Sequence, residues 1–142
     1  MHCLIFGYGY MGRIRCQVLR QHPAVHKITI VDPLVQPLAV EAGATLLAPG
    51  EPIPWDACDA AFICTPNNVT AELCVEALRR CGHVFCEKPP GRSWEEFCRI
   101  VEAAADTPEH TLVFGFNHRL HPAVQAAKVL VADGRLGDIF SV

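Results

Sequence analysis

The sequence has no long apolar segment and no excess of basic residues. Its longest uninterrupted apolar run is Ala60–Cys64, whereas a membrane-spanning helix needs about 20 apolar residues. Lys and Arg number 12 against 15 Asp and Glu in 142 residues, and nucleic-acid-binding domains usually carry a basic face. No basic stretch precedes a long apolar segment at the amino terminus, as it would in a signal peptide. We therefore expect a cytoplasmic protein that binds neither membranes nor nucleic acid.

Metal-binding spacings are also missing, although cysteine is abundant. None of the eight cysteines forms a Cys-x-x-Cys pair, and His118 and His121 have no thiol or carboxylate partner nearby in the sequence. We therefore expect no metal site. Cys3, Cys64 and Cys86 lie in strand-like apolar runs, and three others lie in helix-like ones. This placement predicts buried thiols in a reducing compartment, unlike the disulfides of a secreted scaffold.

Short apolar runs alternate with amphipathic helical stretches along the chain. Hydrophobic residues make up 51% of the sequence, which is ample for a core, and the length suits one domain. The alternation predicts an α/β fold with a doubly wound, mostly parallel sheet covered on both faces. We expect strands at His2–Phe6, Lys27–Val31, Thr45–Leu47, Ala60–Cys64, Val84–Cys86 and Thr111–Phe116, and helices at 12–20, 38–42, 69–80, 93–105 and 122–133, with another strand beginning at Asp138.

A glycine-rich turn lies between the first predicted strand and the first predicted helix. It has the pattern G-x-G-x-x-G and consists of Gly7, Tyr8, Gly9, Tyr10, Met11 and Gly12. The first glycine permits a tight turn, the second lets the backbone approach a pyrophosphate, and the third allows close helix–strand packing. The free amides of the helix N-terminus would then face the phosphates. A purely structural turn is the alternative.

Asp32 strengthens the case for a dinucleotide. It follows Gly12 by 20 residues, at the end of the second predicted strand, where a carboxylate accepts hydrogen bonds from the adenosine ribose. A carboxylate there repels the 2′-phosphate of NADP, and Pro33 supplies no cation to offset the repulsion. Arg13 and Arg15 have the pattern of ordinary helix residues. The sequence therefore favours NAD over NADP.

Two further motifs follow the fourth and fifth predicted strands. Thr65, Pro66 and Asn67 come first, and Glu87 and Lys88, followed by proline, come second. Both lie at the carboxyl edge of the sheet, where ligands bind in open α/β folds. Thr65 or Asn67 could instead cap the next helix. Glu87 and Lys88 could equally form a solvated ion pair.

Taken together, these motifs resemble the Gfo/Idh/MocA family of sugar and polyol oxidoreductases. The matching segments are G-Y-G-Y-M-G, Asp32, C-T-P-N, C-E-K-P-P and G-F-N-H-R-L-H-P-A-V, in this order. The resemblance implies that Lys88 is the catalytic lysine beside the nicotinamide. It also implies cofactor contacts by the following residues: the glycine turn, Asp32, Thr65, Pro66, Asn67, Glu87, Lys88, Asn117 and Arg119. One departure is Thr70, which stands where the family commonly has histidine.

The resemblance also sets expectations for domains and function. It implies a Rossmann domain over residues 1–120, and a linking helix with the start of a second, α+β substrate domain over 121–142. We expect the rest of that domain to be missing and the chain alone to be inactive. The expected function is the cofactor-binding part of an NAD-dependent oxidoreductase with a sugar or polyol substrate. The alternative is a non-catalytic dinucleotide-binding sensor or interaction module, and homo-oligomerisation stays open.

Overall fold

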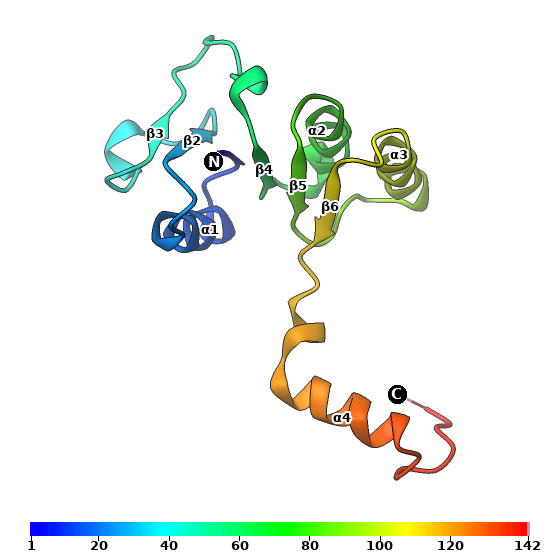
Figure 1. Cartoon of the computed structure of the whole chain (residues 1–142). Coiled ribbons are helices and arrows are strands. Elements are labelled where there is room, and N and C mark those ends of the chain that lie inside the picture. The colour runs from blue at the N-terminus through cyan, green and yellow to red at the C-terminus, as the bar shows by residue number, and fades with distance from the viewer. Residues whose placement is uncertain (142) are drawn as a thin grey trace.

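Buried apolar residues form a single parallel sheet. The computed structural model describes residues 1–141. Within them, six parallel strands lie in the order β3-β2-β1-β4-β5-β6 (Figure 1). The central strand β1 is buried at every residue, as a sheet covered on both faces requires. The strands are β1 (His2–Phe6), β2 (Lys27–Val31), β3 (Thr45–Leu46), β4 (Ala60–Ile63), β5 (His83–Cys86) and β6 (Thr111–Phe114).

Helices cover the two faces of the sheet. The described part of the chain contains α1 (Tyr10–Gln21), α2 (Asn67–Arg80), α3 (Trp94–Ala105) and α4 (Pro122–Ala132), with 3₁₀ turns η1 (Pro37–Ala39), η2 (Trp55–Ala57) and η3 (Asn117–Leu120). Leu4 and Phe6 of β1 enter a core shared with α2 and α3, whereas Ile5 enters a core shared with α1. This alternation is the two-residue period of a strand.

The order of the strands reverses at β1. The chain first builds β1, β2 and β3 and then crosses back to place β4 on the other side of β1. Phe6 pairs with both Val31 and Ile63, so the three strands end at one level. Loops leaving β1 and β4 diverge at this point, which is where ligands bind in open α/β sheets.

The predicted doubly wound α/β fold is confirmed, and all six strands predicted before residue 120 are present. The capping box predicted α3 correctly, because the Ser93 hydroxyl accepts a hydrogen bond from the Glu96 amide at 3.3 Å. The helix predicted at 38–42 is instead the single turn η1. Pro37 begins this turn, and no buried residue anchors it against the sheet.

The strand predicted from Asp138 is wrong over the residues described. Residues 138–141 have no regular structure, and Val142 lies outside the described residues. A strand needs a neighbour for its backbone hydrogen bonds. Figure 1 shows α4 and this segment standing away from the sheet, so no strand lies beside it.

Two cysteines also depart from the prediction of free thiols. Cys58, at the end of η2, and Cys81, at the end of α2, form a disulfide with their Cα atoms 5.4 Å apart. The fold brings these positions together at the amino edge of the sheet, because β4 and α2 run in opposite directions between them. Cys3, Cys16, Cys64, Cys74, Cys86 and Cys98 are free and at least partly buried, as predicted.

The segment from Leu120 onward is the most exposed part of the fold. No residue of α4 is buried. Leu120 is 70% exposed, Ile139 45% and Phe140 95%. Among residues 1–141, none of the helices has the length and apolar character needed to cross a membrane.

Candidate dinucleotide-binding site

Three glycines shape the turn between β1 and α1 in different ways. Gly7 has a φ of +83°, and a Cβ there would lie 2.7 Å from the Cys64 carbonyl oxygen. A Cβ on Gly12 would lie 2.0 Å from the Gly7 carbonyl oxygen. Gly9 differs, because a Cβ on it would meet nothing within 4 Å. The protein therefore requires Gly7 and Gly12 for its own packing, whereas the space above Gly9 is open to a ligand.

The N-terminus of α1 opens onto the same space. Gly9 is the N-cap residue, so no side chain caps the helix. The first turn contains no acidic residue. The first amides of a helix have no partner within it, and the helix dipole makes them attractive to anions. Tyr10 and Met11 contribute such amides. This terminus suits a phosphate group.

Asp32 is fixed beside this turn by two backbone amides. The Tyr8 amide donates to one carboxylate oxygen at 2.7 Å, and the Leu34 amide donates to the other at 2.9 Å. The Tyr8 side chain points into the core and is only 1% exposed. Burial raises the pKa of its phenol. Tyr8 can therefore reach a ligand only through its backbone.

A crevice of about 400 Å³ lies between the glycine turn and the end of β4. It is at the reversal point of the strand order. Its lining consists of Gly7, Gly9, Val31, Asp32, Pro33, Leu34, Cys64, Thr65, Pro66 and Val69. Burial, followed by the Glu87 carboxylate, raises the pKa of the Cys64 thiol to about 12. This cysteine is therefore a neutral wall residue and no nucleophile.

The turn after β4 is held by Thr70, a residue outside the site motifs of the sequence. Pro66 occupies the cap position of α2, and no side chain caps that helix, so neither Thr65 nor Asn67 has the capping role. Thr70 is 1% exposed, and its hydroxyl lies 3.0 Å from the Pro66 carbonyl and 3.1 Å from the Thr65 hydroxyl. Thr70 thus fixes the turn by bonding back along the helix. A threonine one turn into a helix is the only signal of this role.

The structure decides against one of the two alternatives for Glu87 and Lys88, the ion pair between them, because Glu87 pairs with Arg15. The Arg15 Nε and Nη2 atoms both donate to one oxygen of Glu87, at 2.9 Å and 2.5 Å. Arg15 is therefore no ordinary helix residue, which corrects an expectation. Lys88 is exposed, and the described residues give it no ion-pair partner. The adjacency of Glu87 and Lys88 in the sequence gave no indication of the Arg15 partner.

Asn117 and Arg119 lie in η3, beyond the carboxyl end of β6, and both are exposed. In residues 1–141, no hydrogen bond joins either side chain to the glycine turn or to Lys88. Their contact with a cofactor stays a prediction. The same range holds no group of three or more His, Cys, Asp or Glu arranged for a metal ion.

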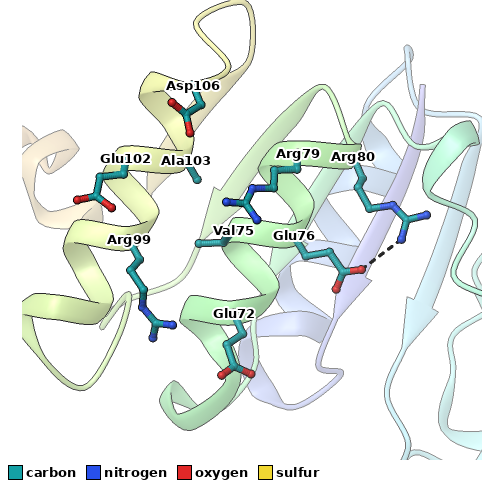
Figure 2. Close-up of a pocket in the computed structure, with 9 residues that line it drawn as sticks. All are labelled: Glu72, Val75, Glu76, Arg79, Arg80, Arg99, Glu102, Ala103 and Asp106. Carbon is teal, nitrogen blue, oxygen red and sulfur yellow. Dashed lines mark hydrogen bonds and ion pairs between the residues drawn. The ribbon is translucent and has the colours of Figure 1, made fainter.

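A larger cavity, of about 590 Å³, lies elsewhere on the molecule. Figure 2 shows it between α2 and α3, with charged side chains from both helices along its walls. Arg80 and Glu76 form an ion pair at 3.3 Å, and the apolar residues Val75 and Ala103 also line the cavity. None of the sequence motifs contributes to it. We therefore place the candidate site in the smaller crevice, because the glycine turn, Asp32 and Thr65 line it.

Comparison with known proteins agrees with this geometry. Residues 1–115 match the family described as "Oxidoreductase family, NAD-binding Rossmann fold", which is Gfo/Idh/MocA. The chain belongs to this family. The resemblance drawn from the motifs is therefore confirmed.

Two relatives whose names state an activity match most of the chain. Inositol 2-dehydrogenase of Rhizobium meliloti is 30% identical over 142 residues, covering 95% of this chain and 42% of the relative. D-xylose 1-dehydrogenase (NADP(+)) 2 of Haloferax volcanii is 34% identical over 113 residues, covering 80% and 32%. The chain thus spans less than half the length of these relatives.

Solved family structures have the same fold. Scyllo-inositol dehydrogenase from Lactobacillus casei, with NAD(H) and scyllo-inositol bound, superposes with a TM-score of 0.78 over 98% of this chain and 43% of that one. Its 24% identity supports the fold alone. The family description indicates a Rossmann domain that binds a nicotinamide dinucleotide. Among the names of these similar proteins both NAD(H) and NADP(+) occur.

Proposed function

We propose that this chain is the cofactor-binding part of an NAD-dependent oxidoreductase that transfers a hydride between nicotinamide and a sugar or cyclitol. The observation that carries the proposal is the presence of Lys88 at the same sheet edge as the glycine turn. Lys88 directly follows β5, and the glycine turn directly follows β1. A lysine at a ligand-binding edge, with no ion-pair partner among residues 1–141, can donate a hydrogen bond to a substrate oxygen.

The residues present fit a dinucleotide. The open space at Gly9 and the uncapped start of α1 suit a pyrophosphate. The Asp32 carboxylate keeps lone pairs available beyond the two amides that fix it, which suits ribose hydroxyls. Thr65, Pro66 and Val69 line the same crevice as the glycine turn and give it a mixed polar and apolar wall. These contacts support a nicotinamide dinucleotide on this turn.

In the reaction, the bound dinucleotide supplies a hydride acceptor or donor. Lys88 would donate a hydrogen bond from its ammonium group to the reacting oxygen. A cation placed there stabilises the negative charge that develops on that oxygen as the hydride leaves. Removal of the hydroxyl proton needs a base, with Lys88 able to relay the proton. Substrate-binding groups would come from outside residues 1–142.

The proposed cofactor is NAD, and Asp32 supports this choice. Its carboxylate is held in one orientation beside the glycine turn. A 2′-phosphate placed at that ribose would lie against a fixed negative charge without a neighbouring cation from Pro33 or Leu34. Repulsion between like charges a few ångströms apart costs of the order of 1–4 kcal/mol near a protein surface.

The proposal is tested in two steps. First, the chain is titrated with NADH and NADPH, and tighter binding of NADH is expected. Second, the chain is joined to the remaining, carboxyl-terminal part of the Rhizobium meliloti inositol 2-dehydrogenase. NADH formation by this chimera is then measured with a panel of inositols, hexoses and amino sugars.

Lys88→Met in the chimera should lower kcat by at least about a hundredfold and leave NADH affinity within about threefold, as expected for a group that acts in the transition state. Lys27→Met is the matched control, because Lys27 begins β2 at the opposite edge of the sheet. A chimera that binds NADH but oxidises no member of the panel would favour the sensor alternative.

A further inference from the structure

The carboxylate of Glu87 is buried where three elements meet. Glu87 follows β5 and is 7% exposed. One of its oxygens accepts both hydrogen bonds from Arg15 of α1. The other lies against Gly115, where a Cβ would come within 2.7 Å of it. Gly115 follows β6 and donates its amide to the Cys86 carbonyl at 2.8 Å. One side chain thus joins the helix of the glycine turn to the ends of β5 and β6.

Arg15 is held as firmly as its partner. Its side chain is 18% exposed. The guanidinium carbon lies 4.5 Å from the centre of the Phe85 ring, and that ring stacks on Phe62 at 5.7 Å. Arg15 therefore contacts an aromatic face while two of its N–H groups, on Nε and Nη2, donate to one oxygen of Glu87. A planar guanidinium that stacks on a ring and donates two hydrogen bonds would not be reproduced by lysine in full.

A buried ion pair is poor evidence of a role in stability. Removing two charges from water costs several kcal/mol for each ion, and their attraction offsets this cost only partly. An apolar pair of similar volume would often be at least as stable. The position of the pair suggests another role, because the next residue after Glu87 is Lys88.

We propose that Arg15 is a positioning residue for Lys88, acting through Glu87. The pair fixes the backbone that presents Lys88 at the carboxyl edge of the sheet. It also neutralises the carboxylate of the residue that precedes Lys88 in the chain, so the ammonium group stays free for a substrate oxygen. This inference rests on the role proposed for Lys88. It assigns to Glu87 the task of linking α1 to the lysine segment.

Arg13 provides a contrast on the same helix. It is exposed, and its guanidinium carbon lies 5.4 Å from the Tyr8 ring, away from Glu87. Arg13 and Arg15 carry the same charge on one helix, and only Arg15 bonds to Glu87. Arg13→Met is therefore a matched control for Arg15→Met.

The test measures the reactivity of Lys88 in the chain itself. The protein is treated briefly with acetic anhydride, and mass spectrometry compares acetylation of Lys88 with that of Lys27 and Lys128. Removing Arg15 leaves the Glu87 charge uncompensated, and this charge then favours the unreactive ammonium form of the amine on the next residue. Arg15→Met should therefore slow the labelling of Lys88 about threefold or more. Arg13→Met should leave it unchanged.

Two further variants separate charge from packing. Arg15→Met combined with Glu87→Gln should restore the labelling of Lys88, because the uncompensated charge is gone. Arg15→Lys loses the stacking on Phe85 but keeps the positive charge, so its labelling of Lys88 should stay close to that of the wild type. The inference is overturned if Arg15→Met leaves Lys88 labelling unchanged, or if the double variant labels as slowly as Arg15→Met. NADH titration of each variant is a separate readout. A wild-type chain that fails to bind NADH would refute the proposed function and leave this comparison intact.

Discussion

The Tyr8 amide donates a 2.7 Å hydrogen bond to the Asp32 carboxylate. This bond connects the glycine turn after β1 to the end of β2, and it involves only the backbone of Tyr8. The Leu34 amide holds the second oxygen at 2.9 Å. The orientation of the carboxylate is therefore set by the course of the chain. The negative charge at this point is fixed before any ligand binds.

Replacing Asp32 should change the choice of cofactor. Asp32→Ser removes the charge beside the site expected for the ribose 2′ position. We expect the ratio of NADPH to NADH affinity to rise about tenfold, equivalent to about 1.4 kcal/mol. Titration calorimetry with both dinucleotides measures the ratio. Asp56→Ser, at an exposed position of the turn η2, is the control. An unchanged ratio in Asp32→Ser, or tighter NADPH binding by the wild type, would contradict the argument.

Alanine at two glycines of the same turn should have opposite consequences. Gly12→Ala places a Cβ 2.0 Å from the Gly7 carbonyl oxygen, so the backbone must move. Overpacking of this kind typically costs about 1–3 kcal/mol of the free energy of unfolding, or more. Gly9→Ala meets no protein atom within 4 Å, and its stability should stay within about 0.5 kcal/mol of the wild type.

The affinity for NADH should show a second effect, which concerns Gly9→Ala. The methyl group of Gly9→Ala occupies the space proposed for the pyrophosphate, so NADH affinity should fall at least about tenfold in a fully folded protein. Thermal unfolding and NADH titration of both variants provide the comparison. A Gly9→Ala variant that binds NADH normally would mean that the phosphates lie elsewhere.

The glycine turn, the strands and Asp32 could be predicted because each depends on a local pattern. Arg15 and Glu87 are 72 residues apart, and their pairing depends on how α1 lies against the ends of β5 and β6. No local pattern encodes that contact, so the sequence left open an ion pair between Glu87 and the neighbouring Lys88. The disulfide of Cys58 likewise depends on where α2 ends. Residues 138–141 are the opposite case, in which a local pattern predicted a strand and none forms. A strand also needs a neighbouring strand for its hydrogen bonds, and the local pattern does not supply one.

The disulfide should stabilise the fold measurably. It closes a segment with a sequence separation of 23 between Cys58 and Cys81. Loop-closure entropy for a loop of this size corresponds to about 3 kcal/mol. Urea unfolding with and without a thiol reductant should show a loss of this order in the wild type and none in Cys58→Ser. Cys98→Ser, which removes a free thiol, should keep the dependence on reductant. Equal stability of the oxidised and reduced wild type would contradict the prediction.

His2 should make the fold less stable in mild acid. Its imidazole is buried between β1 and β2, with Nδ1 3.0 Å from the Ala57 carbonyl oxygen and Nε2 2.8 Å from the Thr29 hydroxyl. A neutral ring satisfies both contacts, since Nδ1–H donates to the carbonyl and Nε2 accepts from the hydroxyl. Burial, followed by repulsion from Lys27, lowers the pKa of His2 below its usual 6.5.

The sign of the effect follows from the difference between the folded and unfolded states. Because the pKa of His2 is lower in the folded state, the unfolded chain binds the proton more readily between the two values. The stability contributed by neutral His2 is therefore present above about pH 7 and is lost as the pH falls below 6.5, by at most about 1.4 kcal/mol per pH unit. Urea unfolding from pH 8 to pH 5 should show this loss in the wild type. His2→Gln, which cannot bind the proton, should have a flatter profile, whereas His118→Gln, on the exposed turn η3, should follow the wild type. Parallel profiles for His2→Gln and the wild type would assign the acid sensitivity to other groups.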